Sequence, residues 1–155
     1  MPDRVSVVIA EDEAIIRLDL KETLIEEGYD VVGDTARGDH AIELVAEHEP
    51  DVVILDIKMP GMDGMQFLKK LMGSDSALPV IMITGHGDVP MAVEAMRVGA
   101  FDFLEKPFNP DRMSELAKKA TNARRLVMDN RALRRELSDG SQLMKKLIGG
   151  SPVME

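Results

Sequence analysis

The chain has 155 residues and a formal net charge of −9, and 45% of its residues are hydrophobic, 30% charged and 3% aromatic. This composition predicts one soluble domain of ordinary size with room for an appendage, its acidity argues against broad electrostatic binding of nucleic acid, and the absence of cysteine excludes disulfides, thiolate metal sites and cysteine nucleophiles. No apolar stretch approaches the length that spans a membrane, so we expect a cytoplasmic protein.

Short apolar runs alternate with helical patterns along the chain. The runs predict β-strands at residues 5–10, 31–32, 52–56, 79–84 and 101–105. A helical pattern follows each run, and these helices begin or end at residues that favour such positions, namely Gly28, Pro50, Asp88, Gly99 and Asn109. This alternation predicts an α/β fold in which a parallel sheet is covered by helices on both faces.

Four of the predicted strands end at a residue with a charged or hydroxyl side chain. These residues are Glu11 and Asp12 after the first strand, Asp56 after the third, Thr84 at the end of the fourth and Lys106 after the fifth. The carboxyl ends of parallel strands lie at the edge of the sheet where such folds bind ligands. Each residue alone is weak support for a site, but their joint placement favours one.

The third strand is the centre of this arrangement. Its run of branched apolar residues from Val52 suits a strand buried on both faces, and it ends abruptly in Asp56. A carboxylate there can accept a phosphoryl group, because an aspartyl phosphate divides one difficult displacement into two easier ones. The same junction also suits an aspartate that caps the next turn. This stretch alone leaves both interpretations of Asp56 open.

Three carboxylates at one crevice repel each other and need a cation. Mg²⁺ suits such a site because it takes hard oxygen ligands and commonly bridges protein carboxylates to phosphate. Lys106 adds a point charge for the same phosphate, and Thr84 adds a hydroxyl donor. With Asp56 as the nucleophile, the metal ion and Lys106 would neutralise charge on the transferred phosphoryl group.

In their order and spacing, these residues resemble the receiver domains of bacterial two-component response regulators. The matching pieces are Glu11-Asp12, Leu55-Asp56, Met59-Pro60-Gly61-Met62-Asp63-Gly64, Ile83-Thr84, Phe103 and Lys106-Pro107-Phe108. The resemblance covers residues 5–122. It implies a flavodoxin-like (βα)5 fold, a three-layer sandwich in which five parallel strands have the order 2-1-3-4-5.

The resemblance also implies roles for single residues. Asp56 would take a phosphoryl group from a histidine kinase, with Asp12 and Asp56 as direct ligands of Mg²⁺. The main-chain carbonyl of Lys58 would be a further ligand. Glu11 stands where the family usually has an aspartate, and we expect this longer side chain to bind the metal through water.

Thr84 and Phe103 match the switch residues of the family. The resemblance implies that Thr84 moves to the phosphate and that Phe103 then turns inward. A phosphoryl group adds nearly two negative charges, which would pull Thr84 and Lys106 inward and bias a two-state loop. The surface of the fourth helix, fifth strand and fifth helix would report the change. For Phe103 the alternative is an ordinary strand residue, half buried at the sheet edge.

Beyond Pro110 the helical pattern continues past the edge of the domain. A heptad repeat, interrupted by Lys119, runs through Leu116, Ala123, Leu126, Asn130, Leu133 and Leu137. This repeat predicts a coiled-coil linker helix over residues 123–140 that forms a homodimer, and an asparagine at a core position is a known device for fixing register. The alternative is an amphipathic helix docked on its own domain. We interpret the arginines beside the repeat as solvated flanks rather than a nucleic-acid site.

The heptad repeat breaks after Gly140. Residues 147–155 resemble the opening of the ATPase module of sigma-54-dependent activators, so residues 141–155 are expected to be the start of a truncated AAA+ module. Residues 79–155 resemble the C4-dicarboxylate transport regulators of that group, whereas residues 10–58 resemble receivers of RNA-binding antiterminators. The sequence leaves open whether the chain is a natural fragment or a recombined one.

We therefore predict a phosphorylatable receiver over residues 1–122 that switches its dimer state to control an output module, with no membrane or direct nucleic-acid partner. One rival is an aspartyl-phosphate hydrolase, but such enzymes carry a second aspartate two residues after the nucleophile, where this chain has Lys58. The other rival is a receiver-like module that works without phosphorylation, and the presence of Asp56, Thr84 and Lys106 argues against it.

Overall fold

The computed structural model describes residues 4–59, 61, 64–85 and 88–147, with side chains as far as residue 137. The strands are β1 Ser6–Ala10, β2 Asp30–Thr35, β3 Val52–Asp56, β4 Val80–Thr84 and β5 Asp102–Glu105. The helices are α1 Ala14–Glu26, α2 Gly38–His48, α3 Gly64–Ser74, α4 Val89–Val98 and α5 Pro110–Leu147. Part of the family motif after Met59 and the predicted ATPase segment from residue 148 onward lie outside the described residues.

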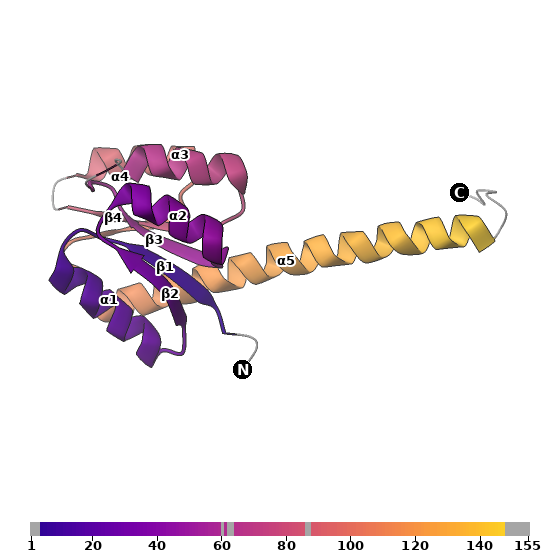
Figure 1. The fold of residues 1–155 in the computed structure, drawn as a ribbon, viewed down its shortest axis with the longest axis horizontal. Coiled ribbons are helices and arrows are strands. Elements are labelled where there is room, and N and C mark those ends of the chain that lie inside the picture. The colour runs from indigo at the N-terminus through magenta and orange to yellow at the C-terminus, as the bar shows by residue number, and fades with distance from the viewer. Residues whose placement is uncertain (1–3, 60, 62–63, 86–87, 148–155) are drawn as a thin grey trace. The chain divides into compact units, whose positions relative to one another are not determined.

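The strands form one parallel sheet in the order β2-β1-β3-β4-β5. This confirms the predicted flavodoxin-like topology. Because all the strands point the same way, the carboxyl ends of β1, β3, β4 and β5 share one edge of the sheet. That edge carries the residues that the sequence singled out. Figure 1 labels β1 to β4 of this sheet and the helices beside it.

Two apolar cores hold the helices onto the sheet. On one face, Leu20 and Leu24 of α1 and Met113 of α5 pack against β-strand residues such as Ile9 and Ile54. On the other face, side chains from α2, α3 and α4 pack against the alternate strand residues, among them Ala41, Phe67, Leu68, Ala95, Val53 and Leu55. Every residue of β3 and β4 is buried, which explains why both strands read as unbroken apolar runs.

Capping residues set several helix boundaries as expected. Gly28, just beyond the end of α1, has φ +96°, a conformation that costs glycine little and other residues much. Gly99 ends α4 with φ +131°. At the start of α5 the side chain of Asn109 accepts a hydrogen bond of 2.7 Å from the Asp111 amide. Asp88 precedes α4 as predicted, but its side chain makes no capping hydrogen bond.

The second strand is longer than its apolar pair suggested. It runs from Asp30 to Thr35, whereas the sequence predicted only residues 31–32. The polar residues after the pair hid the extension. Backbone pairing with β1 carries the strand through Gly33 and Asp34, with a shift in register between Val7 and Val8 of β1.

The chain divides into two compact units, residues 1–124 and residues 125–155. In the first unit, Leu116 is fully buried among the α1 and α5 side chains of the receiver core. In the second, Leu126, Leu133 and Leu137 are 71%, 55% and 66% exposed. Helix α5 continues through Gly140 to Leu147, because one glycine costs a helix only about 1 kcal/mol. Among the described residues, none of the helices combines the length and apolarity needed to cross a membrane.

Candidate functional site: an acidic cleft at the end of the parallel sheet

Asp56, the last residue of β3, forms the floor of a cleft and is only 4% exposed. The amide of Lys58 donates a hydrogen bond of 3.1 Å to its Oδ1, and the ammonium of Lys106 lies 3.2 Å from its Oδ2. The following loop turns back closely at Gly64, where an added Cβ would lie 2.5 Å from the carbonyl oxygen of Asp56. Only glycine fits there. The backbone at Gly64 therefore packs directly against the backbone of Asp56, which helps to hold Asp56 in place.

Glu11 and Asp12 follow β1 and bring two more carboxylates to Asp56. One oxygen from each of the three residues lies within 4.8 Å of the others. Glu11 is fully buried. Its Oε2 accepts hydrogen bonds from the Glu13 amide at 2.9 Å and from Lys106 at 3.2 Å, whereas its Oε1 is buried with no hydrogen-bond partner among the described residues. A buried carboxylate oxygen without a donor is costly, and a cation in this cluster would satisfy it.

Burial disfavours the ionised form of two carboxyl groups in this cluster, those of Glu11 and Asp56. It raises the pKa of Glu11 from 4.5 to about 8, and the nearby Asp56 charge acts in the same direction. The pKa of Asp56 is also raised, again chiefly because the carboxyl group is buried. The carboxyl groups of Glu11 and Asp56 therefore favour a counter-charge. Together with the nearby Asp12 carboxylate they offer three hard oxygen donors, the kind of ligand that divalent cations such as Mg²⁺ take.

Lys106 is the cation that the chain itself supplies. Its ammonium contacts Glu13 at 2.6 Å as well as Glu11 and Asp56 at 3.2 Å each. Burial lowers the pKa of Lys106, but the hydrogen bond to Glu13 and the charges of Asp56 and Glu11 outweigh burial and raise it overall. Lys106 is therefore a fixed positive charge at the floor of the cleft.

Thr84 is the last residue of β4, and Phe103 lies on the neighbouring strand β5. Thr84 is fully buried, and its hydroxyl faces the carbonyl of Leu104 at 3.5 Å. Phe103 is partly buried and packs against the core on the α2, α3 and α4 side of the sheet. The cleft brings Asp12, Asp56 and Lys106 together with Glu11 at its base, while Thr84 and Phe103 do not line it.

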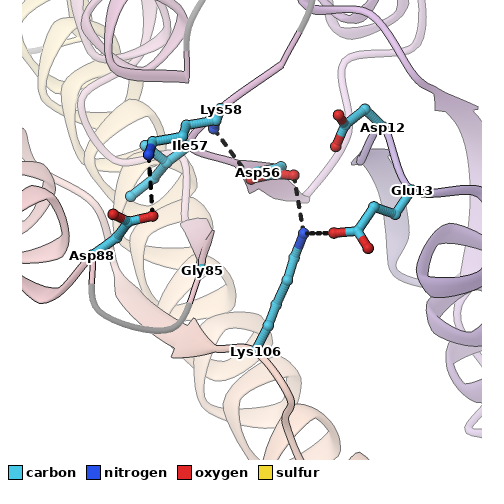
Figure 2. A pocket seen from close by; sticks show the side chains of 8 residues that line it. All are labelled: Asp12, Glu13, Asp56, Ile57, Lys58, Gly85, Asp88 and Lys106. Carbon is cyan, nitrogen blue, oxygen red and sulfur yellow. Dashed lines mark hydrogen bonds and ion pairs between the residues drawn. The ribbon is translucent and has the colours of Figure 1, made fainter.

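Figure 2 shows the cleft from close by. The residues that line it are Asp12, Glu13, Asp56, Ile57, Lys58, Gly85, Asp88 and Lys106. The side chain of Lys58 turns away from Asp56 and pairs with Asp88 at 3.4 Å, on the opposite side from Lys106. Sequence reasoning missed Glu13 and Asp88 as cleft residues. Glu13 directly follows Glu11 and Asp12 in the sequence, and this run of three acidic residues could have identified it. Asp88 was predicted only as the cap of a helix.

Comparison with known proteins decides what kind of domain carries this cleft. Residues 7–118 match the family described as the response regulator receiver domain. The chain belongs to this family. It is the receiver domain of a two-component response regulator, as the sequence motifs indicated, and the matched residues run from β1 into α5.

Similar proteins include both multidomain regulators and isolated receivers. The C4-dicarboxylate transport transcriptional regulatory protein DctD of Rhizobium meliloti is 43% identical over 97% of this chain and 32% of its own length. The chemotaxis protein CheY of Bacillus subtilis is 38% identical over 75% of this chain and 97% of CheY. The crystal structure of NtrX from Brucella abortus with ADP superposes with a TM-score of 0.79 at 33% identity, over 87% of this chain and 30% of NtrX. The chain thus spans about a third of the length of DctD.

Proposed function

We propose that this receiver accepts a phosphoryl group on Asp56 from a histidine kinase. The observation that carries the proposal is the placement of the Asp56 carboxylate at the carboxyl end of a buried strand. It lies beside two further carboxylates and 3.2 Å from the Lys106 ammonium. In the transfer, a carboxylate oxygen of Asp56 forms a bond to phosphorus while the bond from phosphorus to the donor nitrogen breaks, and that nitrogen keeps the electron pair. Lys106 neutralises charge on the transferred group.

The acidic cluster fits Mg²⁺. The ligands would be Asp12, Asp56 and the main-chain carbonyl of Lys58, with Glu11 bound through water. The buried Oε1 of Glu11, which has no hydrogen-bond partner in the described part of the chain, supports this assignment. When bound, Mg²⁺ would neutralise the negative charges of the carboxylates and of the phosphoryl group. The amide of Lys58 already holds Asp56 Oδ1 in place at 3.1 Å, so the same residue would orient both the nucleophile and the metal.

Thr84 and Phe103 would convert phosphorylation into a change of surface. Among the residues that the structure describes, the Thr84 hydroxyl makes one long contact, of 3.5 Å, with the Leu104 carbonyl, and such a weak contact would yield readily to a new acceptor at Asp56. A phosphoryl oxygen would attract this hydroxyl more strongly because charged acceptors make stronger hydrogen bonds. Phe103, one strand away and only partly buried, would then turn inward and alter the face made by α4, β5 and α5.

The output would be control of a transcription-activating module through a homodimer. The relative DctD is named as a transcriptional regulatory protein and is about three times the length of the region matched, which supports an output ATPase and DNA-binding region of the sigma-54-dependent type in a parent protein. The exposed side chains of Leu126, Leu133 and Leu137 support a dimer seam. Since Leu116 is buried in the receiver core, the seam would start at Ala123 and include Asn130.

Incubation with acetyl phosphate and Mg²⁺, followed by intact mass measurement, tests this function against its rivals. A receiver gains one phosphoryl group per chain and releases phosphate slowly. An aspartyl-phosphate hydrolase would release phosphate over many turnovers with little stable adduct, and Lys58, paired with Asp88, offers no carboxylic acid for that chemistry. A module that works without phosphorylation would show neither adduct nor release.

A further inference from the structure

The first turn of α1 breaks the usual rules for a helix start. Glu13 is its N-cap, but the Glu13 side chain makes no capping hydrogen bond and instead contacts Lys106 at 2.6 Å. The first turn has no acidic residue, although negative charge is favourable there, and Arg17 closes it with a positive charge that the helix dipole disfavours. Local rules are broken most often where residues serve a site, so these two side chains warrant a functional explanation.

Arg17 bends back from α1 to the acidic loop. Its Nη1 donates a hydrogen bond of 2.7 Å to the main-chain carbonyl of Glu11, and its Nε lies 3.4 Å from Asp34 on β2. The Arg17 side chain is only 22% exposed. The planar guanidinium thus joins the acidic loop to the neighbouring strand through two of its nitrogens, which a single ammonium cannot do in the same way.

The hydrogen bond to the Glu11 carbonyl fixes the peptide group that joins Glu11 to Asp12. The preceding peptide group is fixed as well, because the Glu11 amide donates to the carbonyl of Thr35 at 2.9 Å. Since peptide groups are planar, these two contacts define the direction in which the chain enters Asp12. Asp12 itself is exposed, so its carboxylate depends on this backbone to stay near Asp56.

We infer that Arg17 is a positioning residue that orients the Glu11-Asp12 peptide and thereby sets the affinity of the acidic cluster for a divalent cation. This inference rests on the proposed function, since it takes the cluster to be a Mg²⁺ site. Arg17 acts through the main chain, and its positive charge works against a cation nearby. If Arg17 acts by positioning, removing its guanidinium should weaken Mg²⁺ binding. If it acts only through its charge, removing it should strengthen Mg²⁺ binding, so the two effects can be told apart.

The test compares Arg17→Met, Arg17→Lys and the control Lys21→Met by calorimetric titration of the unphosphorylated protein with MgCl₂. Lys21 contacts the same Asp34 at 3.3 Å, so its replacement removes a neighbouring charge and leaves the Glu11 carbonyl contact in place. We expect Arg17→Met to weaken Mg²⁺ binding about 10-fold, the lower end of what loss of an outer partner of a metal ligand costs. Arg17→Lys keeps the charge and one donor nitrogen, so its affinity for Mg²⁺ should lie between those of Arg17→Met and the parent. Lys21→Met should bind Mg²⁺ as tightly as the parent or more tightly.

A second readout separates positioning from general stability. Urea unfolding of each variant with EDTA and with excess Mg²⁺ gives the stabilisation that the metal adds, which should shrink in Arg17→Met and not in Lys21→Met. The inference is overturned if Arg17→Met binds Mg²⁺ as tightly as the parent, or if Lys21→Met weakens binding equally. Should Arg17→Met fail to fold, parental affinity in Arg17→Lys overturns it. A parent that binds no Mg²⁺ would instead refute the metal site of the proposed function.

Discussion

The carboxylate of Glu13 lies 2.6 Å from the ammonium nitrogen of Lys106, 93 residues further along the chain. It is the shortest of the three carboxylate contacts that Lys106 makes among the described residues, and it comes from the most exposed partner, since the Glu13 side chain is 57% exposed. Glu13 therefore competes with Asp56 for the one lysine that the phosphoryl group would need.

Replacing Glu13 with Gln should speed labelling by acetyl phosphate. The change removes the competing carboxylate and one negative charge from the mouth of the cleft, where an anionic donor must enter. Because exposed ion pairs are worth about 0–1 kcal/mol, the rate should rise by no more than about five-fold. The initial rate of adduct formation measures this. Glu26→Gln, which removes an exposed charge from the other end of α1, is the control, and an unchanged or slower rate in Glu13→Gln would contradict the competition.

Glu11→Gln should stabilise the metal-free protein increasingly as the pH rises. Burial raises the pKa of Glu11 to about 8 in the folded protein, from 4.5. The contribution of the Glu11 carboxyl group to the free energy of unfolding is therefore fully present below pH 4.5, and it is lost as the pH rises through about 8. Glutamine has no proton to lose, so its advantage over the parent should widen between pH 5 and pH 9 by about 1 kcal/mol or more, since one pKa unit corresponds to about 1.4 kcal/mol.

Urea unfolding in EDTA at several pH values measures this difference. The exposed Glu22→Gln serves as the control and should run parallel to the parent across the range. Excess Mg²⁺ should reduce the difference in unfolding free energy between Glu11→Gln and the parent at high pH, because a bound cation favours the ionised carboxylate of Glu11. Parallel profiles for Glu11→Gln and the parent would show that the Glu11 carboxyl group ionises normally despite its burial.

The sequence located the cleft and half of the residues that line it, because backbone topology alone gathers the strand ends. Unbroken apolar runs identified β3 and β4, and their ends placed Asp56 and Thr84 on one edge. Side-chain partners were harder to predict. Whether Glu13 turns to its own helix or to Lys106 depends on a contact between distant parts of the chain. Leu116 fits the heptad repeat, yet it is buried in the receiver core, because a repeat in one helix does not reveal where its surroundings change.

The linker should hold the unphosphorylated chain as a dimer. Replacing Leu126 and Leu133 together with Ala removes apolar burial worth about 2–5 kcal/mol per site if both lie in a packed seam. The double variant should then be monomeric at micromolar concentration and still accept phosphate. Sedimentation equilibrium decides this, with Met128→Ala as a control that removes an exposed apolar side chain away from the repeat. A monomeric parent, or a double variant that dimerises as tightly as the parent, would rule out the seam.

The identity of the phosphorylated residue is best settled by trapping it. Borohydride reduces an aspartyl phosphate to homoserine, so protein labelled with acetyl phosphate and Mg²⁺, then reduced and digested, should yield homoserine at position 56. The Asp56→Asn variant, whose amide keeps the size but cannot attack phosphorus, should fold and remain unlabelled. Homoserine at another aspartate, or equal labelling of Asp56→Asn, would contradict the assignment of Asp56 as the phosphoryl acceptor.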